Sequence, residues 1–153
     1  MKKKTKILIS VLIIVVLFII GSAIWWFSPK HFLGNVNPTE SASIEVFNGN
    51  DGNRFTITEK EDIEFLTEHI QAVTMKKDSI SAGLGTTYNL RFLNKQGKEL
   101  DSFIIMTHDL IRQGLILYKS SGELQQAEDY LIELERDKFP DTEWIKGQFE
   151  KAD

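Results

Sequence analysis

Apolar side chains are unevenly distributed along this chain, and the longest apolar run lies near its start. From Ile7 to Phe27, twenty-one consecutive residues carry no charge. A helix rises about 1.5 Å per residue, so such a segment covers the roughly 30 Å hydrocarbon layer of a bilayer. We therefore expect a transmembrane helix over residues 7–27, preceded by a short basic N-terminus at residues 1–6.

Beyond this run, the apolar positions follow two different periods. Alternation of apolar and polar residues predicts strands at 44–46 and 55–57, on either side of an Asn- and Gly-rich turn, and further strands at 88–92 and 115–118. Segment 100–107 is apolar on both faces and is expected to be a central strand. Helical spacing predicts amphipathic helices over about 59–73 and 124–136. The pattern indicates an α+β fold, in which an antiparallel sheet of about five strands packs against two helices.

The segment between the apolar run and the first strand has a different composition. Residues 28–42 contain two prolines, a glycine and several small polar residues without an apolar period. This composition is typical of a spacer. Residues 43–149 then suffice for one hydrophobic core, and we expect them to form a single extracytoplasmic α+β domain.

Charge next to the apolar run predicts its orientation. Lys2, Lys3, Lys4 and Lys6 precede it, so the N-terminus is expected in the cytoplasm and the C-terminal domain outside the cell membrane. Trp25 and Trp26 lie where an aromatic belt meets the membrane interface. The alternative is a cleaved signal peptide, since Gly21, Ser22 and Ala23 supply small residues suited to cleavage after Ala23. The continuation of the apolar run to Phe27 favours an uncleaved, single-pass signal anchor.

Composition narrows the classes of partner. The chain after Phe27 carries 14 basic and 22 acidic side chains, a net charge of −8. This charge argues against nucleic acid as a partner and would attract a basic extracytoplasmic protein. A net charge of this size is also ordinary for a small domain, where it serves solubility. The chain has no cysteine, which excludes disulfides, thiolate metal sites and a lipoprotein anchor.

The search for catalytic chemistry yields no enzyme-like set. His31, His69 and His108 share no metal-ligand spacing, and no nucleophile motif accompanies His108-Asp109. The loop at 48–53 resembles a calcium loop only weakly, because its ligand positions do not match. We therefore expect a protein that is not an enzyme and has no cofactor or metal. The candidates for partner binding are Arg112, Lys76, Lys77 and Trp144.

Several short motifs resemble one known group of proteins. They are Val46-Phe47-Asn48-Gly49-Asn50, Thr56-Ile57-Thr58, Lys76-Lys77-Asp78-Ser79-Ile80-Ser81, Leu90-Arg91-Phe92, Gly97-Lys98 and Ile111-Arg112. The stretch that holds them resembles a family of small exported domains of unknown function from low-GC Gram-positive bacteria, usually carried behind a membrane or lipoprotein segment. The resemblance implies a Gram-positive host and an extracytoplasmic location, and it supplies no catalytic residues.

These observations favour a membrane-anchored binding module that sequesters or senses a cell-surface or secreted protein, as an immunity protein does. Two alternatives remain open. One is an envelope enzyme or small-ligand carrier whose pocket the sequence does not show, and the other is an accessory subunit of a membrane complex.

Overall fold

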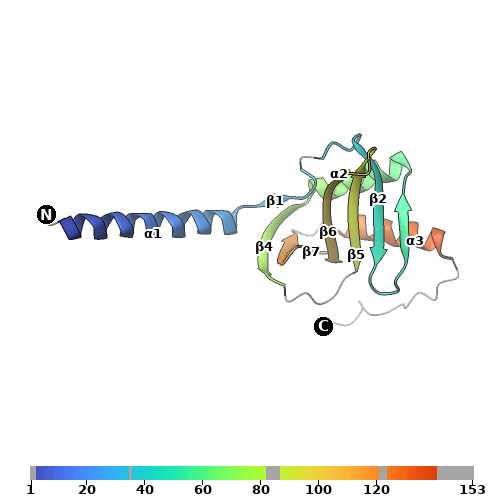
Figure 1. Cartoon of the computed structure of the whole chain (residues 1–153). Helices are drawn as coiled ribbons and strands as arrows, with labels where there is room; N and C mark the ends of the chain where they lie inside the picture. Colours follow the sequence, from blue (N-terminus) through green and yellow to red (C-terminus); the bar gives the residue numbers. More distant parts are fainter. Residues whose placement is uncertain (1–2, 35, 82–86, 121–123, 141–153) are drawn as a thin grey trace, which may run out of the picture.

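A computed structural model describes residues 3–34, 36–81, 87–120 and 124–140. A long N-terminal helix, α1 (Lys3–Phe27), projects from a small α+β domain (Figure 1). Its segment Ile7–Phe27, with a mean hydropathy of 3.2, is long and apolar enough to cross a membrane. A signal sequence near an N-terminus has the same property, so length and composition alone do not distinguish the two.

The domain is built on one antiparallel sheet of eight strands in the order β1-β4-β8-β7-β6-β5-β2-β3. The strands are β1 (Lys30–His31), β2 (Ser41–Asn48), β3 (Arg54–Ile57), β4 (Thr74–Ile80), β5 (Tyr88–Asn94), β6 (Glu99–Thr107), β7 (Leu110–Gln113) and β8 (Ile116–Ser120). The four-residue strand β3 forms one edge. At the other edge, the two residues of β1 cover only the start of β4.

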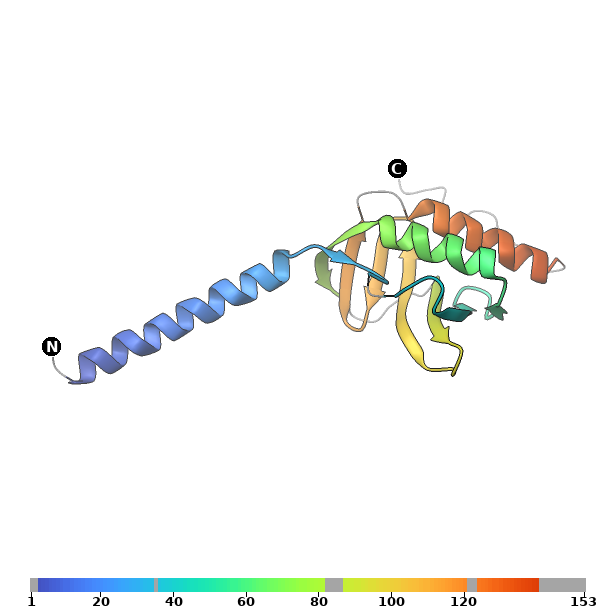
Figure 2. The same cartoon turned by 90° about the horizontal axis from the view of Figure 1, so that it is seen from above.

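Two amphipathic helices, α2 (Lys60–Ala72) and α3 (Gln125–Lys138), lie side by side on one face of this sheet (Figure 2). The Tyr130 hydroxyl on α3 donates a 2.7 Å hydrogen bond to Asp62 on α2, and the Tyr130 ring lies 4.2 Å from that of Phe65. The apolar faces of both helices and one face of the sheet form the core. The opposite face of the sheet carries no helix (Figure 1).

The predicted α+β class, the antiparallel sheet and the two amphipathic helices are confirmed, but the expected number of about five strands is wrong. Strands β1, β4 and β7 were not predicted. Strand β4 contains Lys76, Lys77 and Asp78 in succession, and this charge conceals its alternation. Charged side chains are common on edge strands, because they discourage pairing with other chains. Strands β1 and β7 are too short to show a period.

Residues 28–42, which we expected to form a spacer, instead contribute to the core. Phe32, Leu33 and Val36 are buried, with Phe32 fully inaccessible to solvent. The Gln71 side chain on α2 donates hydrogen bonds to the carbonyl oxygens of Leu33 at 2.7 Å and Val36 at 2.6 Å. The folded domain therefore begins at Lys30, three residues after the end of α1, rather than at residue 43.

Candidate functional site

The helix-free face of the sheet presents two rows of side chains that run across the strands. Strand register places Arg54, Phe47, Asn89, Ile104, Arg112 and Leu117 next to one another, on β3, β2, β5, β6, β7 and β8 in turn. A second row holds Thr56, Glu45, Arg91 and Ser102. Side chains alternate between the two faces along a strand, so both rows lie opposite the core. We call this surface the open face.

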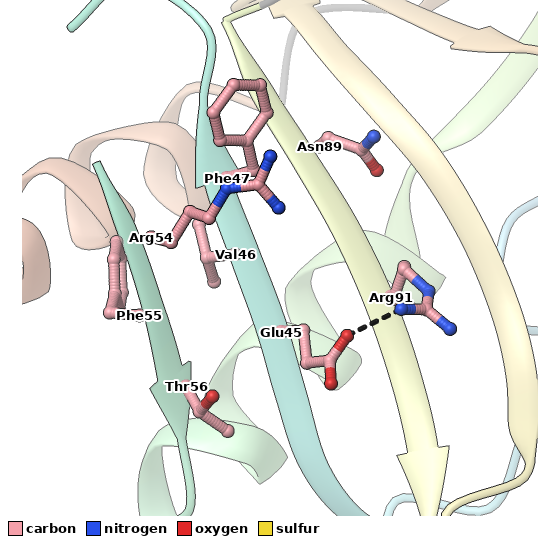
Figure 3. A pocket seen from close by; sticks show the side chains of 8 residues that line it. All are labelled: Glu45, Val46, Phe47, Arg54, Phe55, Thr56, Asn89 and Arg91. Carbon is pink, nitrogen blue, oxygen red and sulfur yellow. Dashed lines mark hydrogen bonds and ion pairs between the residues drawn. The ribbon is translucent and has the colours of Figure 1, made fainter. Parts of the chain in front are cut away.

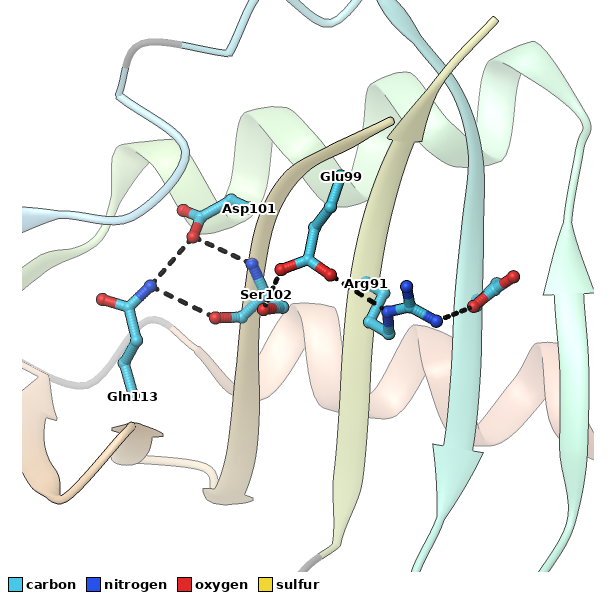
Figure 4. A network of polar contacts seen from close by, with 6 residues as sticks. Arg91, Glu99, Asp101, Ser102 and Gln113 are labelled. Carbon is cyan, nitrogen blue, oxygen red and sulfur yellow. Dashed lines mark hydrogen bonds and ion pairs between the residues drawn. The ribbon is translucent and has the colours of Figure 1, made fainter. Parts of the chain in front are cut away.

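Glu45, Arg91 and Ser102 of the second row form a network with Glu99, which lies at the start of β6 (Figure 4). The Arg91 guanidinium binds Glu45 at 2.7 Å and Glu99 at 3.1 Å, and the Ser102 hydroxyl donates to Glu99 at 2.6 Å. The hydrogen bonds from Ser102 and Arg91 lower the pKa of the Glu99 carboxyl. Because these side chains are about half exposed, the network adds little stability. It also leaves Arg91 without spare charge for a ligand.

The first row differs, because its two arginines have no carboxylate partner among the described residues. The Arg54 guanidinium lies 4.4 Å from the centre of the Phe47 ring, a cation–π contact that leaves its N–H donors available. Arg112 is half-buried between Ile104 and Leu117, and its Nη1 atom is inaccessible to solvent without a hydrogen-bond partner in the described part of the chain. A buried guanidinium nitrogen without an acceptor is costly. Arg112 is therefore a cation on this face whose hydrogen-bonding capacity the described residues do not fully satisfy.

A shallow depression of about 530 Å³ lies beside this row (Figure 3). Strands β2, β3 and β5 line it, and Phe47, Arg54, Glu45 and Arg91 form its walls. Small-molecule sites are usually enclosed and mostly apolar. This depression is open to solvent and lined by charged groups, so it is better suited to a side chain projecting from another protein.

The predicted partner-binding residues are not brought together. Arg112 lies on the open face, and Lys76 is exposed on β4, in a different row. Lys77 points to the other side of β4, where its ammonium group lies 3.7 Å from the centre of the Trp25 ring. Trp144 lies outside the described residues. At the end of α1, Trp25 is exposed and Trp26 is half-exposed, and their ring centres are 6.3 Å apart.

The histidines occupy three separate places. His31 is on β1, and His108 is in the turn between β6 and β7. The His69 ring stacks on Phe65 at 3.9 Å, and its Nδ1 lies 2.8 Å from the Phe65 carbonyl oxygen. Within the described ranges, no group of three or more His, Asp or Glu side chains is arranged to hold a metal ion.

A buried carboxylate that the sequence did not reveal lies at the opposite end of the domain from α1. Glu135 on α3 is fully buried and accepts hydrogen bonds from the Tyr88 hydroxyl at 2.7 Å, from the Asn53 amide at 2.9 Å and from the Asn48 amide at 2.9 and 3.1 Å. Burial, followed by the hydrogen bond to Glu135, raises the pKa of Tyr88. The donors saturate the carboxylate, which fastens α3 to the turn between β2 and β3.

This network also explains the weak resemblance of residues 48–53 to a calcium loop. The Asp51 carboxylate accepts hydrogen bonds from the Asn53 backbone N–H at 3.0 Å and from the Asn48 amide at 3.2 Å. The Asn48 side-chain oxygen accepts one from the Asn50 backbone N–H at 2.9 Å. The polar groups of the loop are thus used to form the turn and to hold Glu135.

Known proteins supply no relative from which a function could be inferred. No protein-family model matches it, and neither the characterised proteins nor the solved structures contain a match. The resemblance to small exported domains of Gram-positive bacteria therefore stays a prediction.

Proposed function

We propose that this protein is a membrane-anchored binding module, with α1 in the cell membrane, its N-terminus in the cytoplasm and its domain outside, and that the open face binds another extracytoplasmic protein. Arg112 is the observation that carries this proposal. Its buried Nη1 lacks an acceptor among the described residues, and the side chain as a whole is only half-buried, so a partner's carboxylate at the accessible part of the guanidinium would form a charge-assisted hydrogen bond.

The rest of the first row supports a protein partner of this chemistry. Phe47 and Ile104 provide aromatic and apolar contact area between Arg54 and Arg112, and Leu117 adds apolar area on the far side of Arg112. Arginine and aromatic residues are enriched where protein interfaces carry most of their binding energy. Four strand spacings of about 4.8 Å put roughly 19 Å between the strands of the two arginines. A partner segment with an apolar centre and a carboxylate near each end would match this row.

The overall acidity of the chain acts at longer range than these contacts. A net charge of −8 after Phe27 still predicts faster encounter with a basic protein. At contact, however, Glu45 and Glu99 are already paired with Arg91. The open face therefore has arginines to offer a partner, and its acidic groups are engaged.

Site-specific photo-crosslinking in cells that produce the full chain tests the proposal. A photoreactive residue replaces Asn89, at the centre of the open face, and in a matched control it replaces Glu133, which is exposed on α3. We expect a single protein adduct from position 89 that position 133 does not yield. The adduct should be lost in Arg112→Gln and kept in Lys95→Gln, a control in the turn between β5 and β6.

Identification of the adduct then allows a direct binding measurement. The affinity of the purified partner should fall with rising salt and fall further in Arg112→Gln. If positions 89 and 133 give the same adducts, or if Arg112→Gln binds as well as the unaltered chain, the open face is not the binding surface.

A further inference from the structure

The edge of the sheet nearest to α1 has an unusual surface. Among the described residues outside α1, Ile80 and Leu115 are the exposed large apolar side chains, with 71% and 69% of their surface accessible. They lie together, because Ile80 pairs with Ile116 and the Leu115 carbonyl oxygen accepts a 2.7 Å hydrogen bond from Ser81. The backbone thus places both exposed side chains at this end of the sheet edge, one at the end of β4 and one in the β7–β8 turn, and we call the two together the apolar patch.

The position of this patch follows from the joint between α1 and the domain. Lys77 on β4 donates a hydrogen bond to the Trp25 carbonyl oxygen in the last turn of α1, and its ammonium group lies over the Trp25 ring. The last carbonyl groups of a helix lack partners within it, and a lysine there also complements the helix dipole. Strand β4 thus caps the end of α1.

A second set of contacts supports the joint from the β1 side. The Lys30 ammonium donates to the Gln113 side chain and lies 4.6 Å from the centre of the Phe32 ring. The Gln113 amide in turn donates to Asp101 at 2.8 Å (Figure 4). Partial burial lowers the pKa of Lys30, and the nearby Lys77 adds to the effect while Asp101 opposes it. The chain between α1 and the sheet is therefore held at several points.

These contacts hold α1 next to the sheet. Of the longer strands, β4 lies beside the end of α1 (Figures 1 and 2). The proposed insertion of α1 in the membrane, on which this inference rests, would put Trp25 at the level of the lipid–water interface, and Lys77 contacts Trp25. The rest of the β4 edge, with the patch at its end, then faces the lipid headgroups. Lys76 on this edge is exposed and has no ion-pair partner in the described residues, and Asp78 is the acidic group beside it.

We propose that this edge rests on the outer surface of the membrane, with Ile80 and Leu115 in the boundary between headgroups and acyl chains and Lys76 against lipid phosphate. Apolar side chains that enter this boundary and lysines that face anionic headgroups are the usual means of interfacial binding. Within the described part of the chain, the same edge has no strand partner beyond the two residues of β1, so the competing occupant is a second copy of the chain.

The experiment uses the full chain in vesicles made of equal parts of phosphatidylglycerol and phosphatidylcholine. The sequence has no cysteine, so Leu115→Cys and Thr56→Cys each accept one nitroxide label. Thr56 is the matched control, because it is exposed on β3 at the opposite edge of the sheet. Spin relaxation is measured with oxygen, which concentrates in lipid, and with a nickel chelate, which stays in water.

We expect the label at position 115 to be relaxed by oxygen and shielded from the nickel chelate, and the label at position 56 to show the reverse. Equal exposure of both labels to the chelate would overturn the proposal. Dipolar broadening between labels at position 115, lost on dilution with unlabelled protein, would also overturn it and would assign the edge to a second copy.

The phosphate contact has its own test. Lys76→Gln should lower the ratio of shielded to exposed label about fivefold in these vesicles, as expected for one lysine at an anionic surface, and should change nothing in pure phosphatidylcholine. Lys95→Gln should have no effect in either lipid. An unchanged ratio for Lys76→Gln in the anionic vesicles would remove Lys76 from the proposal. Far-ultraviolet circular dichroism confirms that each variant is folded.

Discussion

Replacement of Phe32 by alanine should severely destabilise the domain, although the sequence around it has the composition of a linker. The Phe32 ring is fully buried and meets two other rings edge-on, those of Phe103 and Tyr118, each with a centre-to-centre distance of 5.1 Å. A buried Phe→Ala change costs about 3–5 kcal/mol, and each aromatic pair adds about 0.5–1.5 kcal/mol beyond burial. We therefore expect the upper part of that range.

Such a loss is large relative to the whole stability of a small domain, which is about 5–15 kcal/mol. The assay is urea unfolding of the full chain in mild detergent, followed by circular dichroism. With an m value of about 2 kcal/mol/M, the urea midpoint of Phe32→Ala should fall by about 2 M. His31→Ala is the matched control, because the neighbouring His31 side chain is exposed and should shift the midpoint little.

Truncation tests the same reasoning on a larger scale. A fragment that starts at Ser41 lacks Phe32, Leu33 and Val36, three core side chains worth about 1.5–3 kcal/mol each. It should be mostly unfolded, whereas a fragment that starts at Ser28 keeps all three. If the two fragments unfold at the same urea concentration, or if Phe32→Ala matches His31→Ala, residues 28–42 are a spacer after all and the described packing is wrong.

Three further predictions concern the buried tyrosines and the joint with α1. Tyr88→Phe removes a hydrogen bond to the buried Glu135 carboxylate and should lower the free energy of unfolding by about 1.5–3 kcal/mol. Urea unfolding measures this loss, and it should exceed the loss in Tyr130→Phe, whose ring is only half-buried. The folded-state pKa of all three tyrosines is raised, mainly by burial for Tyr88 and Tyr118 and by the hydrogen bond to Asp62, to about 12, for Tyr130. The contribution of such groups to stability is complete below the unfolded pKa of about 10 and declines as pH rises above it. Tyrosinate absorbance should therefore appear at higher pH in the native protein than in urea. If the two titrations coincide, the described burial of the tyrosines is wrong. Lys77→Met removes the cap on the Trp25 carbonyl and should broaden the distance distribution between spin labels at Leu17 and Thr56, whereas Lys95→Met should leave it unchanged.

The elements that the sequence predicted well are those with a clear period over many residues. Strands β2, β3 and β5 follow the expected alternation, and both amphipathic helices follow the expected helical spacing. Strand β6 was predicted from apolar residues on both of its faces and lies inside the sheet, as expected. In residues 28–42, Pro29, Gly34 and Pro38 indicated a loop, and the described residues between β1 and β2 do form one. A loop composition does not show whether the apolar residues within it are buried, because their partners on α2 and β8 are distant in sequence.

The same limit applies to the candidate site. Arg112 was singled out as a basic residue that stands out in an acidic domain, and the structure adds that its Nη1 is buried on the open face. Its neighbours in the row depend on a strand order that a single sequence does not contain. Glu135 reads as an ordinary helix residue, since its partners Asn48, Asn53 and Tyr88 lie 47 to 87 positions away.

The two proposed surfaces constrain each other geometrically. Strand order places β4 and β3 at opposite ends of the sheet, so a domain with β4 on the membrane holds β3 farthest from it. Two strand spacings, roughly 10 Å, then separate Arg112 from the β4 edge, whereas Arg54 lies about six spacings out, at roughly 29 Å. A partner embedded in the membrane would reach Arg112 and leave Arg54 free. A secreted partner that binds the whole row would extend along it, away from the membrane surface. The effect of Arg54→Gln relative to Arg112→Gln on crosslinking therefore distinguishes a membrane partner from a secreted one.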